Sequence, residues 1–118
     1  MRPFNASKPL KYRNRKVIAS EGKFDSQKEY ARWQELKLQE KTGYIKGLQR
    51  QVVYDLADSV ILYGRHKPKL RFIADFVYIK NGMLVVEDVK SAITKIDPIF
   101  RIKLHLMKAT HNIEVKLT

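Results

Sequence analysis

The pattern of hydrophobic and polar positions predicts two helices in this chain. Apolar residues recur at helical spacing between Ser26, which suits a helix N-cap, and Gly43, which ends the run. A second helix is predicted to begin at Asp97-Pro98, because proline is favoured in the first turn of a helix, and to end near Thr110. The first helix is amphipathic, as expected of a helix that packs one face against a core.

Strand patterns occupy most of the remaining sequence. Residues 70–79 and 83–89 are rich in β-branched and aromatic residues and are separated by Asn81-Gly82, a pair that favours the type I′ turn of a two-residue hairpin. Both faces of these strands are apolar, so we expect the hairpin in the middle of a covered sheet. Weaker alternation predicts strands over residues 48–56 and 113–117.

The region between the predicted strands at residues 48–56 and 70–79 is less regular. Residues 60–63 are compatible with a strand extension, and residues 64–69 are predicted to form a turn or basic loop. The predicted order is therefore helix, strand, strand, strand, helix, strand, which is an α/β class with a mixed sheet. Residues 21–118 are expected to form a single domain, because no linker or repeat interrupts them and the length suffices for one core.

The charge adds a preference for one kind of partner. The chain has 118 residues, with 24 Lys and Arg against 12 Asp and Glu, and a formal net charge of +12. Residues 1–20 contain cations but no acid and show no helical or strand period, so we predict a basic N-terminal arm in which Val17 and Ile18 pair as a short edge strand. Such an excess favours a nucleic-acid partner, whose phosphates it would neutralise, although a solvated tail fits the arm equally well.

Several classes of protein are excluded by what the sequence lacks. The absence of cysteine excludes a disulfide framework and any zinc or iron–sulfur site with cysteine ligands. No apolar run approaches the roughly 18 residues of a membrane-spanning helix, and the first residues lack the apolar segment of a secretory signal. We therefore expect a cytoplasmic protein without membrane association.

The predicted hairpin brings two acidic residues face to face. Counting down the ladder from its two-residue loop places Phe76 opposite Glu87 and Asp75 opposite Asp88. Because side chains alternate along a strand, Asp88 and Lys90 share the face of Asp75, and Glu87 points to the other face. A β-bulge would shift this register by one residue and exchange the positions of Asp88 and Glu87.

Facing carboxylates inside an apolar strand pair are destabilising unless something offsets their repulsion. A shared proton, Lys90 alone or a divalent cation would each do so, whereas a position at the hydrated rim of the sheet would avoid the problem. Glu29, in the first turn of the first helix, lies on its apolar stripe and would add a third carboxylate. However, Ser26-x-x-Glu29 is also the spacing of a capping box, in which Glu29 would only satisfy the helix end.

At these residues the chain resembles the PD-(D/E)XK nucleases, which have the restriction-endonuclease-like fold. The match is Ile73-Ala74-Asp75-Phe76, with Ala in place of the usual Pro, followed by Asp88-Val89-Lys90. The chain is more closely similar to a phage and prophage family of small nucleases related to Holliday junction resolvases. Four ordered blocks carry this similarity: Lys11-Tyr12-Arg13-Asn14, Phe24-Asp25-Ser26-Gln27-Lys28-Glu29, Ile73-Ala74-Asp75-Phe76-Val77-Tyr78 and Val86-Glu87-Asp88-Val89-Lys90.

The resemblance implies a Mg²⁺-dependent DNA endonuclease, with Mn²⁺ as a substitute, that hydrolyses phosphodiester bonds in branched or structured DNA such as a Holliday junction. It implies that Asp75, Asp88, Glu29 and the backbone carbonyl of Val89 bind the metal and that Lys90 is the catalytic lysine. Because cutting two strands requires two sites, it also implies a homodimer. The cations expected to bind DNA are those of the arm and of the basic loop: Lys8, Lys11, Arg13, Arg15, Lys16, Arg65, Lys67 and Lys69.

Other interpretations of the sequence remain open. A non-catalytic DNA-binding or host-protein-binding module on the same fold would lack metal-dependent cleavage. A ribosome-associated basic protein would account for the charge but would leave the Asp75–Asp88 pair unexplained. Among the aromatic residues, Tyr12 and Tyr63 are candidates for stacking on bases, whereas Trp33 is expected in the core because it lies on the apolar stripe.

Overall fold

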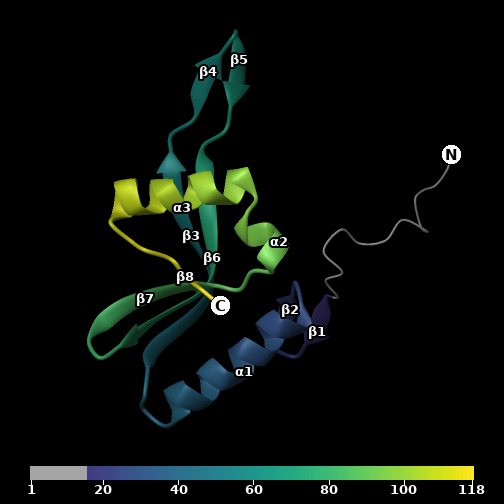
Figure 1. Cartoon of the computed structure of the whole chain (residues 1–118), viewed down its shortest axis with the longest axis vertical. Coiled ribbons are helices and arrows are strands. Elements are labelled where there is room, and N and C mark those ends of the chain that lie inside the picture. Colours follow the sequence, from purple (N-terminus) through teal and green to yellow (C-terminus); the bar gives the residue numbers. More distant parts are fainter. Residues whose placement is uncertain (1–15) are drawn as a thin grey trace, which may run out of the picture.

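The computed structural model describes residues 16–118, without the side chains of Ala92 and Ile93, and shows a mixed α+β fold (Figure 1). Its elements are β1 (Val17–Ala19), β2 (Gly22–Phe24), α1 (Gln27–Lys41), β3 (Lys46–Ala57), β4 (Val60–Leu62), β5 (Arg65–Lys67), β6 (Leu70–Lys80), β7 (Met83–Asp88), α2 (Ala92–Lys95), α3 (Pro98–His111) and β8 (Lys116–Leu117). The predicted order of helix, three strands, helix and strand is confirmed. Two short hairpins and α2 are added to it. None of the helices in this part of the chain is both long and apolar enough to cross a membrane.

The central sheet has the strand order β3-β6-β7-β8. β6 pairs antiparallel with both β3 and β7, and β8 pairs parallel with β7, so the predicted mixed sheet is confirmed. The last strand is shorter than predicted, because only Lys116–Leu117 pairs with β7. The alternation that includes Ile113 and Val115 instead reflects packing of these side chains against the core.

The β6–β7 hairpin has the predicted turn and register. Asn81 and Gly82 have φ angles of 54° and 76°, as the two central positions of a type I′ turn require. The ladder continues without a shift to Phe76 opposite Glu87. No bulge therefore intervenes, and Asp88 lies where the unshifted register places it.

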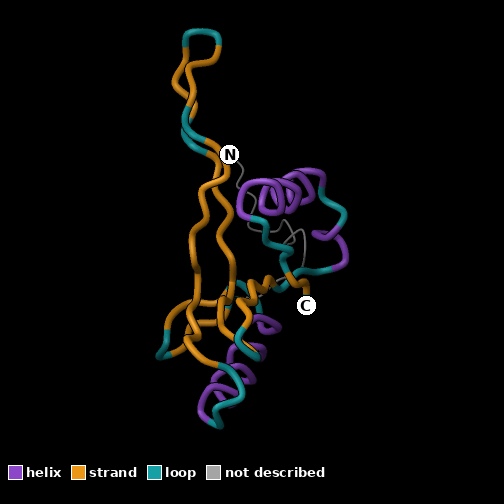
Figure 2. The backbone as a smooth tube through the Cα atoms, turned by 90° about the vertical axis from the view of Figure 1, so that its left-hand side faces the viewer, coloured by secondary structure: helices purple, strands orange, loops and turns teal. Residues whose placement is uncertain are grey.

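A second hairpin corrects the prediction of a loop over residues 64–69. Arg65–Lys67 form β5, which pairs with β4, and we call residues Val60–Lys67 the finger hairpin. The strand was missed because β5 contains no apolar residue and so has no hydrophobic alternation. The finger hairpin continues the long β3–β6 ribbon beyond the body of the protein (Figure 2).

The beginning of the described chain forms a third hairpin. Val17–Ala19 and Gly22–Phe24 pair as β1 and β2, which confirms the expected edge strand at Val17 and Ile18. Its partner strand was not predicted. Residues 1–15 of the predicted basic arm lie outside the described residues.

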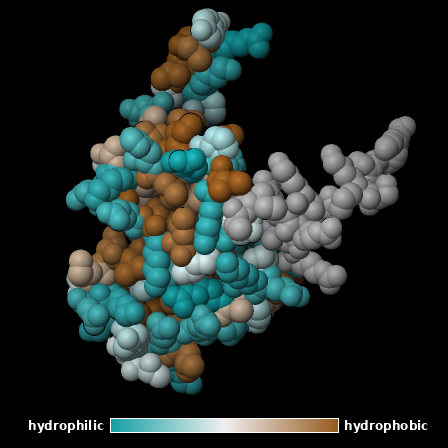
Figure 3. Space-filling model, in the orientation of Figure 1, coloured by the Kyte–Doolittle hydropathy of each residue, from teal (hydrophilic) through white to brown (hydrophobic). Residues whose placement is uncertain are grey.

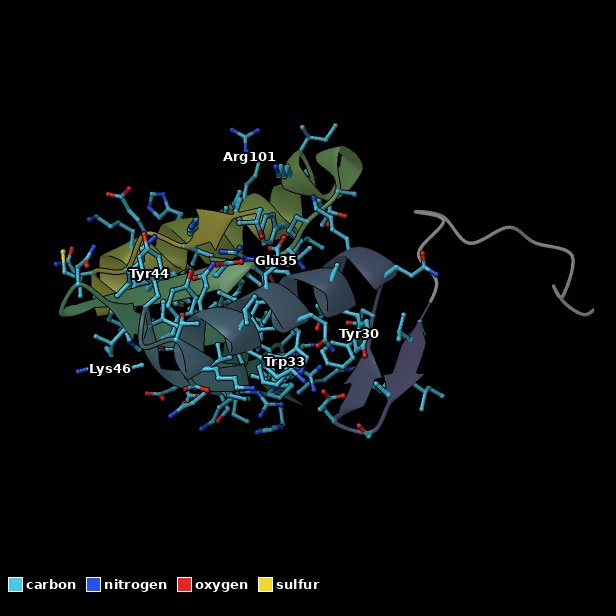
Figure 4. All side chains as sticks on the ribbon, turned by 90° about the horizontal axis from the view of Figure 1, so that it is seen from below. Tyr30, Trp33, Glu35, Tyr44, Lys46 and Arg101 are labelled. Atoms are coloured by element: carbon cyan, nitrogen blue, oxygen red, sulfur yellow. The ribbon has the colours of Figure 1, made fainter. Side chains whose placement is uncertain are left out.

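Two apolar clusters hold the helices on the sheet. The first joins α3 to the sheet and consists of Leu56, Phe72, Ala74, Val77, Val86, Phe100 and Met107. The second joins α1 to the sheet and consists of Leu36, Ile45, Phe76 and Tyr78, with Trp33 packed against it as expected from its position on the stripe. Trp33, labelled on α1 in Figure 4, stacks on Phe76 with 6.0 Å between the ring centroids.

Near Gln51, the side chains of β6 that lie on one face change from one apolar cluster to the other. In β6, Ala74 belongs to the α3 cluster and Phe76 to the α1 cluster, although residues two apart on a regular strand share a face. Gln51 has a φ of 53°, and the register between β3 and β6 continues on both sides but omits the pair Gln51–Asp75. This irregularity places Gln51 and Asp75 at the level where the two clusters meet.

Candidate functional site

Asp75 and Asp88 lie together just beyond the last ladder pair of β6 and β7. Asp88 Oδ1 accepts a hydrogen bond from the backbone N–H of Asp75 at 3.1 Å, and Asp75 Oδ2 accepts one from the backbone N–H of Val89 at 2.9 Å. Each carboxylate thus bonds to a main-chain N–H of the other strand, just beyond the point where the β6–β7 ladder ends. Both side chains are buried, and the hydrated-rim alternative does not apply.

The second oxygen of Asp88 has unusual surroundings. Asp88 Oδ2 is buried and has no hydrogen-bond partner within residues 16–118. The Lys90 Nζ lies 3.1 Å from it, close enough for ion pairing but outside hydrogen-bond geometry. Burial and the charge of Asp75 raise the pKa of Asp88 above its ordinary value, and Lys90 opposes this rise. A buried oxygen of this kind is unfavourable unless a cation satisfies it.

Glu29 on α1 is the third carboxylate near this pair. Its backbone N–H donates to Ser26 Oγ at 3.1 Å, so the N-cap half of a capping box is present. Its carboxylate also reaches β3, where it lies 3.6 Å from the Nη2 of Arg50. Burial, followed by the charges of Asp75 and Asp25, raises the pKa of Glu29 to about 7. The capping role therefore does not account for the whole position of this side chain.

Gln51 connects two of the three carboxylates, Glu29 and Asp75, and the sequence pattern did not indicate it. Its Nε2 donates to Glu29 Oε2 at 3.5 Å and to Asp75 Oδ1 at 3.3 Å. The positive φ of Gln51 is uncommon for a residue with a Cβ, and it occurs at the irregularity between β3 and β6. A glutamine in an alternating strand is not distinctive, so no local signal could have identified it.

A small pocket opens beside these carboxylates. Its volume is about 150 Å³, and its lining includes Glu29, Asp75, Val89 and Lys90, while Asp88 is buried next to them. Pockets for organic ligands are larger, roughly 300–1,000 Å³, so this one suits an ion with its waters. In the described part of the chain no three His, Cys, Asp or Glu side chains converge as a metal-binding group. A cation here would therefore also need waters or main-chain oxygens, which Mg²⁺ accepts readily.

Two wider grooves adjoin the pocket. One, of about 390 Å³, shares Lys28 and Val89 with it, and the other, of about 430 Å³, shares Lys90. Cations line both: Lys28, Arg32 and Lys116 in the first, and Lys69, Arg71, Lys90 and Lys103 in the second. Spaced cations on both sides of an acidic pocket suit the backbone of a nucleic acid.

Glu87 lies on the opposite face of β7 from Asp88, as the register predicts. Its carboxylate accepts hydrogen bonds from Arg32 at 2.5 and 3.0 Å and from the hydroxyl of Tyr78 at 2.6 Å. Burial opposes its ionisation, but these hydrogen bonds outweigh burial and hold the pKa of Glu87 below its ordinary value. Glu87 is therefore part of a satisfied structural network, and Asp88 is the acid that lies beside Asp75.

The cations that were predicted to bind DNA lie in different parts of the structure. Lys16 lies 3.5 Å from Asp25, which lines the pocket, and Arg65 and Lys67 belong to the finger hairpin. Lys69 lines the second groove, where it also pairs with Asp55 at 3.2 Å. The remaining predicted cations lie outside the described residues: Lys8, Lys11, Arg13 and Arg15. Sequence reasoning missed five groove cations, because single basic residues on helices and strands carry no local signal: Lys28, Arg32, Arg71, Lys103 and Lys116.

Comparison with known proteins yields one match. A family model described as "Protein of unknown function (DUF1064)" matches residues 9–118. No curated protein and no solved structure matches the chain. The family description assigns no activity, so a function has to be argued from the pocket, its carboxylates and the grooves beside it.

Proposed function

Because the chain belongs to the DUF1064 family, we propose its function from its site: a Mg²⁺-dependent DNA endonuclease with a restriction-endonuclease-like core. It would hydrolyse phosphodiester bonds in branched or structured DNA. One observation carries the proposal. Asp75 in the middle of β6 and Asp88 at the end of β7 are linked by two hydrogen bonds, and Lys90 lies against the buried oxygen of Asp88 that has no hydrogen-bond partner in the described chain.

The residues at the pocket fit a hard divalent cation. Asp75, Asp88, Glu29 and the carbonyl of Val89 would hold it, and all of these donors are oxygen atoms, which Mg²⁺ and Mn²⁺ prefer. When bound, the cation would supply charge neutralisation at the scissile phosphate and a lowered pKa for a water molecule. It would also offset the charge of Asp75, which, after burial, raises the pKa of Glu29 and Asp88.

The side chains around the pocket have distinct tasks in this proposal. Lys90 lines both the pocket and the second groove, so a phosphate lying in that groove meets an ammonium at the edge of the pocket. This ammonium would stabilise the charge that develops on the phosphate or orient the attacking water. Gln51 would keep Glu29 and Asp75 at a constant separation through its two hydrogen bonds.

The grooves favour a polymer over a small phosphate ester. Cations along them would hold several phosphates in succession, and contacts of this kind carry no sequence information. This favours recognition of DNA shape, such as a branch point. Because a branch must be cut on two strands, we propose that the active form is a homodimer.

Cleavage of a labelled four-way junction during a Mg²⁺ titration tests the proposal. We expect product to appear with Mg²⁺ or Mn²⁺, to be absent in EDTA, and to exceed the product from a linear duplex of the same sequence. Tight binding of the junction without cleavage under either metal would exclude the nuclease. It would leave a DNA-binding module on the same fold.

The metal-free protein should lose stability as the pH rises from about 5 to about 7. The pKa of Glu29 is raised from 4.5 to about 7, and that of Asp88 is also raised, so in this range the folded state binds more protons than the unfolded chain. Unfolding therefore becomes easier as the pH rises. Added Mg²⁺ should restore the loss at neutral pH, because it binds the ionised carboxylates.

Thermal unfolding in EDTA at several pH values measures this effect. We expect a fall of several degrees in Tm for the unmodified protein and a flatter dependence for Glu29→Gln, which removes one of the two groups. A metal-free Tm that rises from pH 5 to pH 7 would show that the buried carboxylates do not control stability in this range.

A further inference from the structure

The finger hairpin projects from the protein at the opposite end of the β3–β6 ribbon from α1 (Figures 1 and 2). All residues of β4 and β5 are exposed, and Tyr63, at the tip, is 94% exposed. Figure 3 shows the apolar side chains that gather there, which come from Val60, Ile61 and Leu62. A two-stranded hairpin without a core beneath it is marginally stable in water, so an apolar tip in this position needs a reason.

Tyr63, at the tip, occupies a turn position whose geometry does not favour a bulky residue. Tyr63 and Gly64 have φ angles of 53° and 75°, and Asn81 and Gly82 in the β6–β7 turn have 54° and 76°. Both turns thus have the same positive φ values at their two central positions, a geometry that favours Asn, Asp or Gly first. A bulky side chain at a positive φ is an outlier. Because Tyr63 is 94% exposed, packing within residues 16–118 does not explain it, whereas a contact with a partner would.

Charge indicates what that contact is. Arg65 and Lys67 face Leu62 and Val60 across the ladder, so cations and apolar side chains occupy one face of the finger hairpin. An exposed aromatic ring beside cations is the combination that binds unpaired nucleotides, because the ring stacks on a base while the cations hold phosphates.

The second groove extends from the pocket toward the base of the finger hairpin. It contains Lys90 at the pocket and Lys69, which stands two residues after β5 at the base of the finger hairpin. Arg71 and Lys103 lie along the same groove. A backbone that follows these cations from the pocket would arrive at the finger hairpin. This continuity favours nucleic acid over a second copy of the chain as the partner.

We propose that the finger hairpin is a base-stacking wedge. Tyr63 stacks on a base that is exposed where the DNA duplex opens, and Arg65 and Lys67 hold the flanking phosphates. The inference rests on the proposed nuclease function, since the same DNA would occupy the groove and the pocket. It adds a basis for substrate choice, because a branch point exposes unstacked bases and a continuous duplex does not.

Tyr63→Asn tests the wedge without damaging the turn, since Asn-Gly is the pair that the chain uses in its other hairpin. Affinity is measured in EDTA for a labelled four-way junction and for a linear duplex of the same sequence. We expect the junction affinity to fall about ten-fold or more, as the loss of one stacked base predicts. The duplex affinity and the Tm should not fall. Tyr63→Phe keeps the ring and should keep the junction affinity.

A fluorescent base reports the contact directly. With 2-aminopurine at the branch point, the unmodified protein should change its fluorescence on binding, and Tyr63→Asn should not. Tyr44→Ala is the matched control. Tyr44 is also exposed, at 60%, and lies beside the ammonium of Lys80, but it follows α1, at the other end of the protein from the finger hairpin (Figure 1). Its replacement should leave affinity and fluorescence unchanged.

Two results would overturn the wedge. One is an unchanged junction affinity and fluorescence for Tyr63→Asn. The other is a loss of self-association, measured by light scattering, without an effect on DNA, which would make the finger hairpin an interface between copies of the chain. Both are separate from the nuclease test. If the protein binds junctions through Tyr63 but does not cut them, the wedge is supported and the nuclease function is excluded. If Tyr63→Asn leaves both binding and cleavage unchanged, the nuclease function is supported and the wedge is excluded.

Discussion

Asp75→Asn should abolish metal-dependent cleavage, with a loss of about three orders of magnitude or more, while binding of DNA in EDTA stays within about two-fold. The substitution removes the charge of one of two linked carboxylates. The amide oxygen can still accept the hydrogen bond from Val89 N–H, so the substitution loses only the longer hydrogen bond from Gln51 Nε2, at 3.3 Å. The fold should therefore survive, so that the loss of cleavage reports on the site.

The same substitution should raise the Tm of the metal-free protein at neutral pH by several degrees. The charge of Asp75 contributes, after burial, to the raised pKa values of Glu29 and Asp88. Its removal relieves repulsion that the metal-free protein otherwise carries. Thermal unfolding in EDTA measures the change. A lower metal-free Tm would show that the lost hydrogen bonding outweighs the repulsion, contrary to the role assigned to the pair.

Glu87→Gln is the matched control for Asp75→Asn. Glu87 is also a buried carboxylate, next to Asp88 in sequence, but it faces Arg32 and Tyr78 on the other side of the sheet. Loss of this buried ion pair should destabilise the protein by roughly 3–5 kcal/mol. Cleavage, assayed below the lowered Tm, should remain within several-fold of the unmodified protein. Equal losses from the two variants would mean that cleavage follows stability, not the pocket.

Lys90→Ala should reduce the rate of cleavage by roughly 10²–10⁴-fold. Its Nζ lies 3.1 Å from Asp88 Oδ2 and lines both the pocket and the second groove, so the variant removes the ammonium nearest to a bound phosphate. Metal affinity should change less, because Lys90 repels a cation but also lowers the pKa of Asp88. Single-turnover rates and half-saturation by Mg²⁺, measured at about pH 8, separate the two effects.

Lys108→Ala provides the comparison for Lys90→Ala. Lys108 also lies beside a carboxylate, 3.4 Å from Glu114, but it is exposed on α3 and does not line the pocket. Both variants lose one positive charge, so a general effect of charge on DNA affinity would appear in both. Only Lys90→Ala should slow the single-turnover rate. The same rate in both variants would remove Lys90 from the mechanism.

The features that were predicted correctly are those with a local cause. Ser26 and Asp97 cap the two helices as expected, because capping depends on the residue and on the N–H groups two or three positions later. The β6–β7 register followed from a two-residue loop, since such a loop aligns its strands without help from the rest of the fold. From that register came the separation of Asp88 from Glu87.

The features that were missed lack hydrophobic periodicity. Arg65–Lys67 pairs with β4 through its backbone, and none of its side chains is apolar. The strand β2 is three residues long, and α2 has four, which is too short for a helical period to be recognised. A hydrophobic pattern needs several residues to be recognised, so elements of three or four residues pass unnoticed.

The sequence by itself determined the two helices, the central hairpin and the facing of Asp75 and Asp88, because each depends on residues close along the chain. Only the tertiary structure decided that Glu29 meets this pair through Gln51. That meeting requires α1, β3 and β6 to pack together, and it occurs where two clusters impose different faces on the same strands. The positive φ of Gln51 accompanies this change of face, which no stretch of sequence encodes alone.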